Sequence, residues 1–526
     1  MRFNLIDDPW IEVIQVKKYD TTTVSLGELL AHPSDYYMIA GESRPQALSI
    51  LRLVLAVLTA AYEGEGPDKR RELYQAGQFD GKVSTYLAKW HDCFDFFGGR
   101  PFYQVTRSEF NALVDDKHQI TDSKIIKGTG TVAVRQINRT ISESGNSPAI
   151  FASRPDSERD RIDLSELVRW VITYQNYTGV TDKTKLAGAK YKASPGWLFR
   201  TEPLWLTGQN LFETLIFNLV LLPGEQRPVW EYDAPQDYVQ RVLKGGLPDN
   251  ISELYTNQAR LLHIDWSTGK PTIFPIVMPV LDSTQPTVEQ MAMVRQDGPV
   301  AYGWVDPSPL KHYLWLSTDR ILGQGTLPGV IQHIAELAPA VPADKQVALT
   351  SQTYLWDGKP VSQAPAGEYA DSLTVSFRVL TDPDWCQVIV KASQLTAKYY
   401  RRYLVLCRHI WQIRTGQANL NPQRKATVER MAWAFNNRAN GLFKRWATKL
   451  GRDGQTTDQA LTDWSQALYK IAMGLYQDFE GQLGPRDYRT VEWPEDLDPS
   501  LPANAFEALA LYRGAIEHYR HADFDN

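Results

Sequence analysis

Between residues 385 and 455 the chain gathers cationic side chains whose chemistry suits phosphate binding. This segment holds fourteen Lys or Arg residues against two acids, Glu429 and Asp453, which gives a local net charge of +12. Because the whole chain sums to -5, the remaining residues sum to -17. A clustered basic face releases the condensed counterions of a nucleic acid, so a polyanion is the expected partner. A solvated helical surface is the alternative interpretation.

The spacing inside this basic segment predicts one long helix. Four polar residues recur at intervals of 7, 4 and 7 and therefore share a stripe that we expect to contact nucleic acid: Lys391, Lys398, Arg402 and His409. An apolar stripe with intervals of 7, 4, 7 and 4 runs beside it and predicts the buried side: Val388, Leu395, Tyr399, Leu406 and Ile410.

Residues that could support catalysis are sparse. His91 and Asp92 suggest a metal-dependent nuclease, but no second His/Asp cluster with ligand spacing accompanies them. The chain also lacks the GK[ST] of a phosphate-binding loop. We therefore expect a nucleic-acid-binding protein without a catalytic site, a cofactor or a metal. A nuclease that uses His91 and Asp92, and a stand-alone architectural DNA-binding protein, stay open as alternatives.

The elements that must position these residues predict an α+β fold. A large mixed α/β domain over residues 1–380 is expected to precede a four-helix bundle over residues 381–526, whose basic face spans 385–455. In the first domain we expect strands such as Trp10–Val16 and Leu373–Leu380. They are mixed with helices near Pro45–Tyr62, Leu164–Gln175 and Leu211–Leu222. After the basic helix, the bundle continues with helices over about 423–450, 458–479 and 503–521. The second of these bundle helices is expected to bury Val428, Met431, Ala432, Phe435, Leu442 and Trp446.

Cysteine usage and the apolar runs predict a cytoplasmic protein without a membrane partner. Cys93, Cys386 and Cys407 lie too far apart to form a CxxC pair or a disulfide framework. The N-terminus shows no signal-peptide pattern. The apolar run 47–61 is interrupted by Arg52 and is short for a bilayer, so we expect a buried helix there.

Four segments in order resemble one known family. The opening "FNLIDDPWIEV" (Phe3–Val13) is similar to the start of the CasA family, the large subunit of the type I-E CRISPR surveillance complex called Cascade. "RPFYQV" (Arg100–Val105), "SGNSPAIF" (Ser144–Phe151) and "ETLIFNLVLLP" (Glu213–Pro223) resemble family segments as well. Part of this likeness is expected to reflect packing, with Leu5, Ile6, Trp10 and Ile11 in the core.

The resemblance implies a role in RNA-guided defence. Family members are non-catalytic, inspect the protospacer-adjacent motif on double-stranded DNA, help to open the duplex, and recruit a helicase-nuclease. The implied partners are the CRISPR guide RNA, the target DNA, and the backbone, small and guide-end-capping Cascade subunits. Since base pairing with the guide supplies sequence specificity, protein loops need to recognise only a few base pairs. A transposon-associated complex that recruits other machinery is a further possibility within the same resemblance. Some relatives carry paired cysteines consistent with zinc, which the dispersed cysteines of this chain cannot supply.

The resemblance also assigns candidate contacts on three loops. In residues 145–154, which resemble the family's guide-facing loop, Asn146 is expected to hydrogen-bond and Phe151 to stack on a base. Residues 179–196 take the place of a glycine-rich loop, but here the glycines are isolated and lysines are added. Close approach to the minor groove is expected at Gly188 and Ala189, and phosphate contacts at Lys183, Lys185, Lys190 and Lys192.

The third loop, residues 358–369, takes the place of the family's wedge. Ser362 and Gln363 are the candidates to separate the first target base pair there. Each of the three loops has a plainer interpretation: an anchoring Phe in the first, a solvated loop in the second and a surface hairpin in the third.

Overall fold

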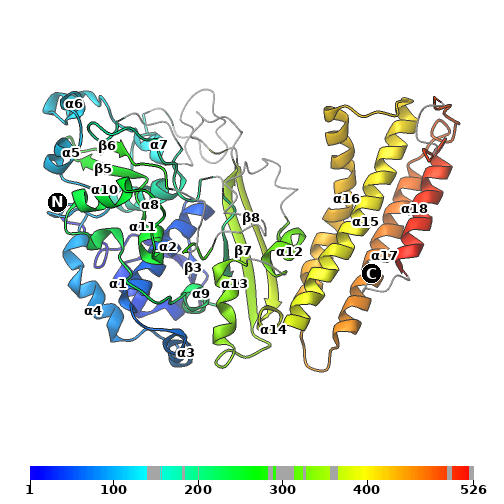
Figure 1. The fold of residues 1–526 in the computed structure, drawn as a ribbon, viewed down its shortest axis with the longest axis horizontal. Helices are drawn as coiled ribbons and strands as arrows, with labels where there is room; N and C mark the ends of the chain where they lie inside the picture. Colours follow the sequence, from blue (N-terminus) through cyan, green and yellow to red (C-terminus); the bar gives the residue numbers. More distant parts are fainter. Residues whose placement is uncertain are drawn as a thin grey trace. The chain divides into compact units, whose positions relative to one another are not determined.

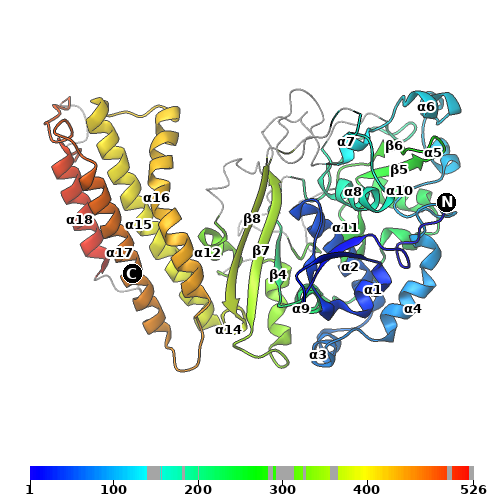
Figure 2. The same cartoon turned by 180° about the vertical axis from the view of Figure 1, so that it is seen from behind.

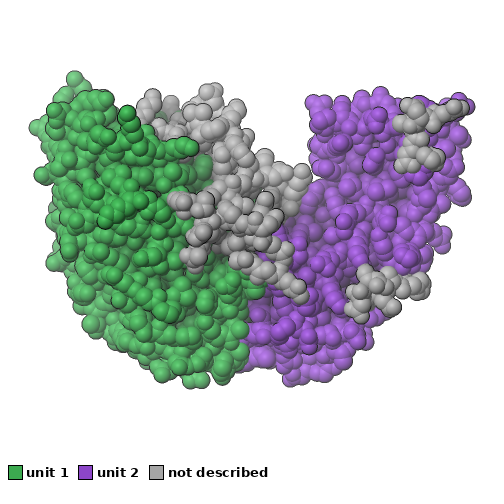
Figure 3. All heavy atoms as spheres, in the orientation of Figure 1, with its two compact units in different colours: residues 1–311, 325–341, 347–372 green, residues 312–324, 342–346, 373–526 purple. Residues whose placement is uncertain are grey.

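The computed structural model describes residues 1–138, 155, 157–179, 184–199, 201–281, 288–291, 313–323, 327–355, 365, 367–494 and 500–520. The chain divides into two compact units, which Figure 3 colours separately. The first unit comprises residues 1–311, 325–341 and 347–372, and the second comprises 312–324, 342–346 and 373–526. The first unit mixes helices with sheets and the second is helical, which confirms the predicted α+β class. The chain enters the second unit at Leu373, within strand β8 (Gly367–Ser376). The boundary proposed near residue 381 lies eight residues later.

The N-terminal signature folds into a small antiparallel sheet with the order β2-β1-β3. Its strands are β1 (Ile11–Gln15), β2 (Thr21–Val24) and β3 (Tyr36–Ile39). Leu5, Trp10 and Ile11 are fully buried, whereas Ile6 is only partly so. The Trp10 indole Nε1 donates to the Leu5 carbonyl at 2.9 Å, so the burial of this indole is compensated by a hydrogen bond. Three of the four residues expected in the core are therefore fully buried.

The core helix of the first unit is α2 (Arg44–Ala61). Ser43 caps its N-terminus by accepting from the Gln46 amide. Among the described residues α2 alone is long and apolar enough to cross a bilayer, but 83% of that window is buried inside the unit. The charge that interrupts the run, Arg52, is fully buried and paired with Glu289 at 2.9 Å. The predicted buried helix is confirmed.

The remaining helices of the first unit surround α2 and two further sheets (Figures 1 and 2). They are α1 (Leu26–Ala31), α3 (Pro67–Ala76), α4 (Gly81–Lys89), α5 (Arg107–Leu113), α6 (Asp122–Lys127), α7 (Val134–Ile137), α8 (Leu164–Tyr177), α9 (Leu211–Asn218), α10 (Pro235–Leu243), α11 (Ile251–Thr256) and α13 (Gly329–Gln332). The sheets are the hairpin β5 (Arg260–Asp265) and β6 (Thr272–Val277), and the set β4 (Leu204–Thr207), β7 (Gln346–Leu355) and β8 (Gly367–Ser376).

Two predicted element ends are wrong. The strand expected over Leu373–Leu380 stops at Ser376, because β8 gives way to helix α14 (Phe377–Thr381). Phe377, Val379 and Leu380 are buried as a helical turn, and a short apolar run fits a helix as well as a strand. The helix expected to reach Leu222 ends at Asn218, since the chain is extended at Leu219.

Four long helices form the bundle of the second unit: α15 (Pro383–Thr415), α16 (Pro422–Ala447), α17 (Thr457–Gly481) and α18 (Ala505–Arg520). Figure 1 shows them side by side from yellow to red, and α15 packs against the other three. The predicted four-helix bundle is confirmed. Four of the five apolar stripe residues on α15 are buried, and Leu395 is partly buried. On α16, Leu442 is 37% exposed instead of buried, and Met431 and Trp446 are half-buried.

A short segment before the bundle completes its core. It comprises the 3-10 helix η6 (Leu314–Ser317) and α12 (Thr318–Ile321). Trp315 is fully buried, stacks on Phe443 of α16 with ring centroids 4.9 Å apart, and donates from Nε1 to Asn440 at 3.0 Å. Sequence periodicity could not assign this segment to the bundle, because it lies about seventy residues upstream of α15.

Candidate nucleic-acid interface

Five of the residues predicted to contact nucleic acid lie outside the part of the chain that the structure describes. They are Asn146, Phe151, Lys183, Ser362 and Gln363. Their assignments stay predictions from the family resemblance. The geometry that can be described belongs to the lysine-containing loop, here called the basic loop (residues 179–196), and to the bundle.

The basic loop begins where α8 ends. Thr178 is the C-cap of α8, and its carbonyl accepts from the Gly196 amide at 2.9 Å, so the two ends of the loop lie together. A Cβ added at Gly196 would stand 2.3 Å from the backbone carbonyl group of Asn176. Such contacts do not occur between real atoms, so Gly196 is needed for close packing on the end of α8.

The described part of the loop follows the edge strand β6 and its continuation. The Thr184 carbonyl accepts from the Val277 amide at 2.9 Å, and the Lys192 carbonyl accepts from the Val280 amide at 3.0 Å. Tyr191 makes a third tie, since its hydroxyl donates to the Val277 carbonyl at 2.7 Å. Burial raises the pKa of this phenol, so Tyr191 remains a neutral donor at physiological pH. The loop is thus anchored at several points along its length.

The lysines of the loop are not equivalent. The Lys185 ammonium donates to the Tyr191 carbonyl at 2.7 Å and lies 5.3 Å from the centroid of the Tyr191 ring. The Lys185 side chain therefore links two parts of the loop. Contact of Lys185 with a phosphate would require this bond to be given up. Lys190 and Lys192, in contrast, are exposed. They are the described lysines of the loop best placed to meet a polyanion.

Gly188, which is exposed, and Ala189, which is partly buried, form a turn between Lys185 and Lys190. Gly188 has φ +66°, and no atom lies within 4 Å of a Cβ added there, so the main chain faces open space. The Ala189 amide closes the turn on the Leu186 carbonyl at 3.2 Å. The backbone at Gly188 is therefore open to the approach of a ligand within the described residues, and its contact with the minor groove stays a prediction.

On the bundle, the predicted stripe lies along α15 beside α18. Arg402 is exposed but donates from Nε to the Tyr519 hydroxyl of α18 at 2.9 Å. Lys398 is exposed as well, whereas Lys391 and His409 are partly buried. The stripe therefore marks an edge between two helices, and half of it has limited access to solvent.

Sequence reasoning missed other cations that the bundle exposes. Arg401 and Arg408, two turns apart on α15, share one exposed face, and α16 exposes Arg430 and Arg445. The same interval of seven that selected the stripe also links Arg401 to Arg408, so the signal was present in the sequence. The spacing alone cannot rank the two rows, because they differ only in burial. We call these four residues the exposed arginines.

The described residues give the nuclease alternative no support. His91 Nε2 donates to the Asp7 carboxylate at 2.8 Å, and the His91 carbonyl accepts from the Asn4 side chain at 3.0 Å. These contacts fasten the N-terminal signature to the chain around His91. In the described ranges no three His, Cys, Asp or Glu side chains are grouped so that they could hold a metal ion. His91 thus has a structural role, whereas the Asp92 side chain is fully exposed.

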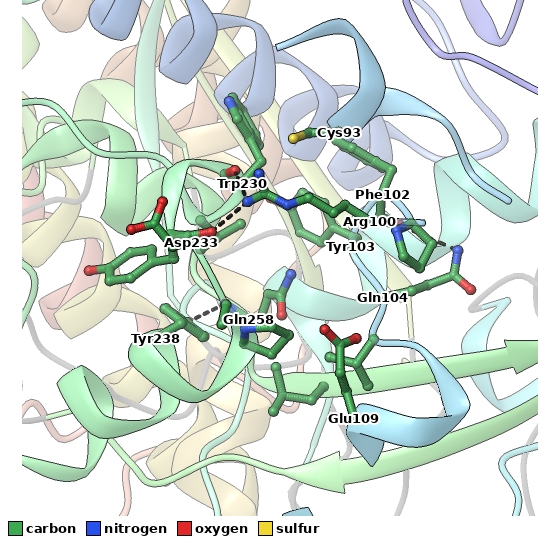
Figure 4. A pocket seen from close by; sticks show the side chains of 17 residues that line it. Cys93, Arg100, Phe102, Tyr103, Gln104, Glu109, Trp230, Asp233, Tyr238 and Gln258 are labelled. Carbon is green, nitrogen blue, oxygen red and sulfur yellow. Dashed lines mark hydrogen bonds between the residues drawn. The ribbon is translucent and has the colours of Figure 1, made fainter. Parts of the chain in front are cut away.

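A cavity of about 90 Å³ lies beside the segment Arg100–Val105 (Figure 4). Arg100 closes one side by donating to the carbonyls of Trp230 and Tyr232 at 3.1 and 2.5 Å. Burial raises the pKa of the Cys93 thiol, which disfavours the thiolate that a nucleophile requires. The aromatic rings of Phe102 and Tyr103 are buried at its wall. The lining mixes aromatic rings with polar side chains, among them Glu109, Asp233 and Gln258.

Comparison with known proteins identifies the family of this chain. The sequence model described as CRISPR-associated protein Cse1 (CRISPR_cse1) matches residues 4–475. The chain belongs to the Cse1 family. A relative from Thermus thermophilus, named CRISPR-associated protein CasA/Cse1, is 27% identical over 234 residues, which cover 44% of this chain and 42% of that protein. The resemblance inferred from the four sequence segments is confirmed.

Solved structures of Cse1 proteins share the fold of this family member. The crystal structure of Thermobifida fusca Cse1 superposes with a TM-score of 0.78 at 18% identity, over 99% of this chain and 98% of that one. A chain from a solved CRISPR RNA-guided surveillance complex superposes with a TM-score of 0.67 at 16% identity, over 98% and 99% of the two chains. At these identities the likeness shows the fold of the Cse1 family and leaves the contacts of individual loops to be tested.

Proposed function

We propose that this Cse1-family protein is the large subunit of a type I-E CRISPR RNA-guided surveillance complex and recognises the protospacer-adjacent motif on double-stranded DNA. The observation that carries the proposal is the basic loop of a family member: a backbone turn at Gly188 open to a ligand, with exposed lysines at 190 and 192. The structural neighbour that belongs to a CRISPR RNA-guided surveillance complex supports the assignment to such an assembly.

The basic loop suits the minor groove. That groove offers a degenerate pattern of donors and acceptors, so a short stretch of backbone suffices to distinguish a few related motifs. Lys190 and Lys192 would bind phosphates and set the position of the loop, and the turn at Gly188 and Ala189 would lie against base edges. Gln363 and Ser362 remain the candidates for the wedge that opens the first base pair, on the family resemblance alone.

The bundle would stabilise the opened target. Its exposed arginines and Lys398 offer charges to the phosphates of the duplex or the displaced strand, independently of sequence. In this scheme the protein acts in the cytoplasm without catalysis of its own, together with the guide RNA and the other Cascade subunits. Recruitment of a helicase-nuclease would then lead to degradation of the target.

The test is target-duplex binding by the guide-RNA complex, assembled with and without this chain, over a library of randomised motif-adjacent trinucleotides. We expect the chain to confine tight binding to a few trinucleotides. The double variant Lys190→Gln/Lys192→Gln should weaken binding, and the charge-matched control Lys17→Gln/Lys18→Gln, on an exposed turn after β1, should not. Binding that is unchanged or uniformly raised across the library would refute the recognition role. Tight site-specific binding by the chain alone would favour a stand-alone DNA-binding protein.

A further inference from the structure

A buried arginine joins the two ends of the basic loop. Arg260, the first residue of β5, is fully buried. Its guanidinium donates from one terminal nitrogen to the Ser194 carbonyl at 2.7 Å and from the other to the Gly179 carbonyl at 2.6 Å. Gly179 opens the loop and Ser194 lies near its end. One side chain therefore holds both ends of the loop at a fixed separation.

Arg260 is itself held in place by α8. The Gln175 side chain accepts from the Arg260 amide at 2.9 Å and donates to the Arg260 carbonyl at 2.8 Å. Gln175 is 1% exposed, so this pair of bonds is shielded from competing water. The planar guanidinium, with donors in fixed directions, can satisfy two carbonyls that diverge, which a lysine ammonium does less well. Helix α8, strand β5 and the loop ends thus form one connected polar network.

The middle of the loop has a second hub in Tyr191. Its hydroxyl accepts from the Leu186 amide at 3.0 Å while donating to Val277, so it links the two sides of the loop to β6. The Lys185 ammonium bonds to the carbonyl of the same residue. With the ends joined by Arg260 and the middle joined by Tyr191, the exposed turn at Gly188 stands on a hydrogen-bonded base.

We propose that Arg260 is a positioning residue for motif recognition, and that Tyr191 assists it, by holding the basic loop in its DNA-binding shape before DNA arrives. This proposal rests on the proposed function of the loop. A loop ordered in advance loses less conformational entropy on binding and presents its backbone at a defined distance from the bases. Discrimination among motifs depends on that distance, whereas attraction of Lys190 and Lys192 to phosphates does not.

The test compares Arg260→Met with a matched variant, Arg70→Met. Arg70 is also fully buried in the first unit and also donates to main-chain carbonyls, those of Ile216, Phe217 and His333, at 2.8 to 3.0 Å. Both variants lose a buried arginine and should lose similar global stability. Hydrogen exchange of the free protein and trinucleotide discrimination by the assembled complex are then measured for each.

We expect Arg260→Met to accelerate exchange by about tenfold or more in peptides covering residues 184–196, because their amides lose protection by local opening. Discrimination between the best and the worst trinucleotide should fall by about tenfold, while binding to non-target duplex stays within about twofold. Arg70→Met should change neither quantity. Arg260→Lys should restore part of the discrimination, since it keeps the charge and one donor direction.

Tyr191→Phe, which removes only a hydroxyl, gives an independent measurement if Arg260→Met does not fold. It should also reduce discrimination and accelerate exchange in residues 184–196. Unchanged exchange and discrimination in Arg260→Met or Tyr191→Phe would overturn the positioning role. If the double lysine variant also leaves binding unchanged, then the proposed function of the loop fails as well, so the two failures are distinguishable.

Discussion

At the scale of single residues, the lysines of the basic loop divide by what their ammonium groups contact. We predict that Lys190→Gln makes the negative slope of log K against log salt for duplex binding shallower by about 0.9, the value of one lost phosphate contact. Lys185→Gln should leave that slope unchanged, because the Lys185 ammonium is bonded to the Tyr191 carbonyl. Titrations of the assembled complex at several salt concentrations measure both. Equal slopes for the two variants would contradict the division.

The glycines of the same loop differ in a way that mutation can measure. Gly196→Ala should destabilise the first unit by about 1–3 kcal/mol, because its Cβ would overlap the Asn176 backbone. Gly188→Ala should cost about 1 kcal/mol, since only the left-handed backbone conformation opposes it. Urea denaturation of the two variants beside the parent protein gives the comparison. A smaller loss of unfolding free energy for Gly196→Ala than for Gly188→Ala would show that the backbone at the end of α8 moves to accommodate the added Cβ.

These residues also show where sequence reasoning stops. Gly188 and Gly196 look alike in the sequence, as do Lys185 and Lys190, because nothing local records which atoms approach from α8 or β6. Arg260 carried no signal at all: it begins an apolar strand 81 residues beyond the carbonyl of Gly179 that it binds. The family resemblance predicts a role for the loop, but the hydrogen bonds that shape it are long-range contacts that one sequence does not reveal.

At the scale of elements, long helices were predictable and short ones were not. The bundle helix α15 repeats its buried positions over about nine turns, so periodicity located it within a few residues. Helix α14 has little more than a single turn, so its apolar residues fit the end of a strand equally well. Segment η6–α12 is too short to show a helical periodicity, and its packing on the bundle depends on the burial of Trp315.

Substitution of Trp315 tests whether segment η6–α12 contributes to the bundle core. Trp315→Ala should destabilise the bundle by about 3–5 kcal/mol, since it removes a fully buried indole that stacks on Phe443 and leaves Asn440 without its donor. Trp411→Ala, at a half-exposed site on α15, should cost markedly less. Thermal unfolding followed by helical circular dichroism measures both. Equal losses would show that the segment adds nothing to the bundle core.

The link between α17 and α18 should respond to pH through one ion pair. Asp487 accepts from Arg414 of α15 at 2.8 and 3.1 Å and from the Gly484 amide at 3.0 Å. The hydrogen bond from Arg414 holds the pKa of Asp487 below its usual value. A carboxylate with a lowered folded pKa stabilises the fold fully above its unfolded pKa of about 3.9, and this contribution is lost as pH falls through the folded value.

Asp487→Asn should therefore destabilise the bundle by about 1–3 kcal/mol at pH 7, and the difference from the parent should shrink below about pH 4. The matched control is Asp478→Asn, whose partner Arg438 is 46% exposed, so that exposed pair should contribute about 1 kcal/mol or less. Urea denaturation at pH 7, 5 and 3.5 measures both variants. A difference for Asp487→Asn that persists unchanged at pH 3.5 would exclude the ion pair as its source.

At the scale of the whole molecule, charge is separated along the chain: +12 over residues 385–455 against -17 elsewhere. The bundle neutralises part of that excess internally, since Arg414 pairs with Asp487 and Arg438 with Asp478. The local net charge therefore overstates the number of cations that can meet phosphates. The exposed arginines and a few lysines remain as the surface available to a polyanion, so the count of contacts should lie well below fourteen.

Salt dependence measures that count. If about six cations of the bundle reach phosphates, log K for non-specific duplex binding should fall against log salt with a slope near -5. Replacing the exposed arginines, Arg401, Arg408, Arg430 and Arg445, by Gln should make the slope shallower by up to about 3.6, because each lost contact contributes about 0.9. Replacing Arg414 and Arg438 should change the slope little, since their charges are already paired.

Trinucleotide discrimination should survive replacement of the four exposed arginines, because phosphate contacts on the bundle carry no sequence information. A loss of discrimination in that variant would instead place motif recognition on the bundle.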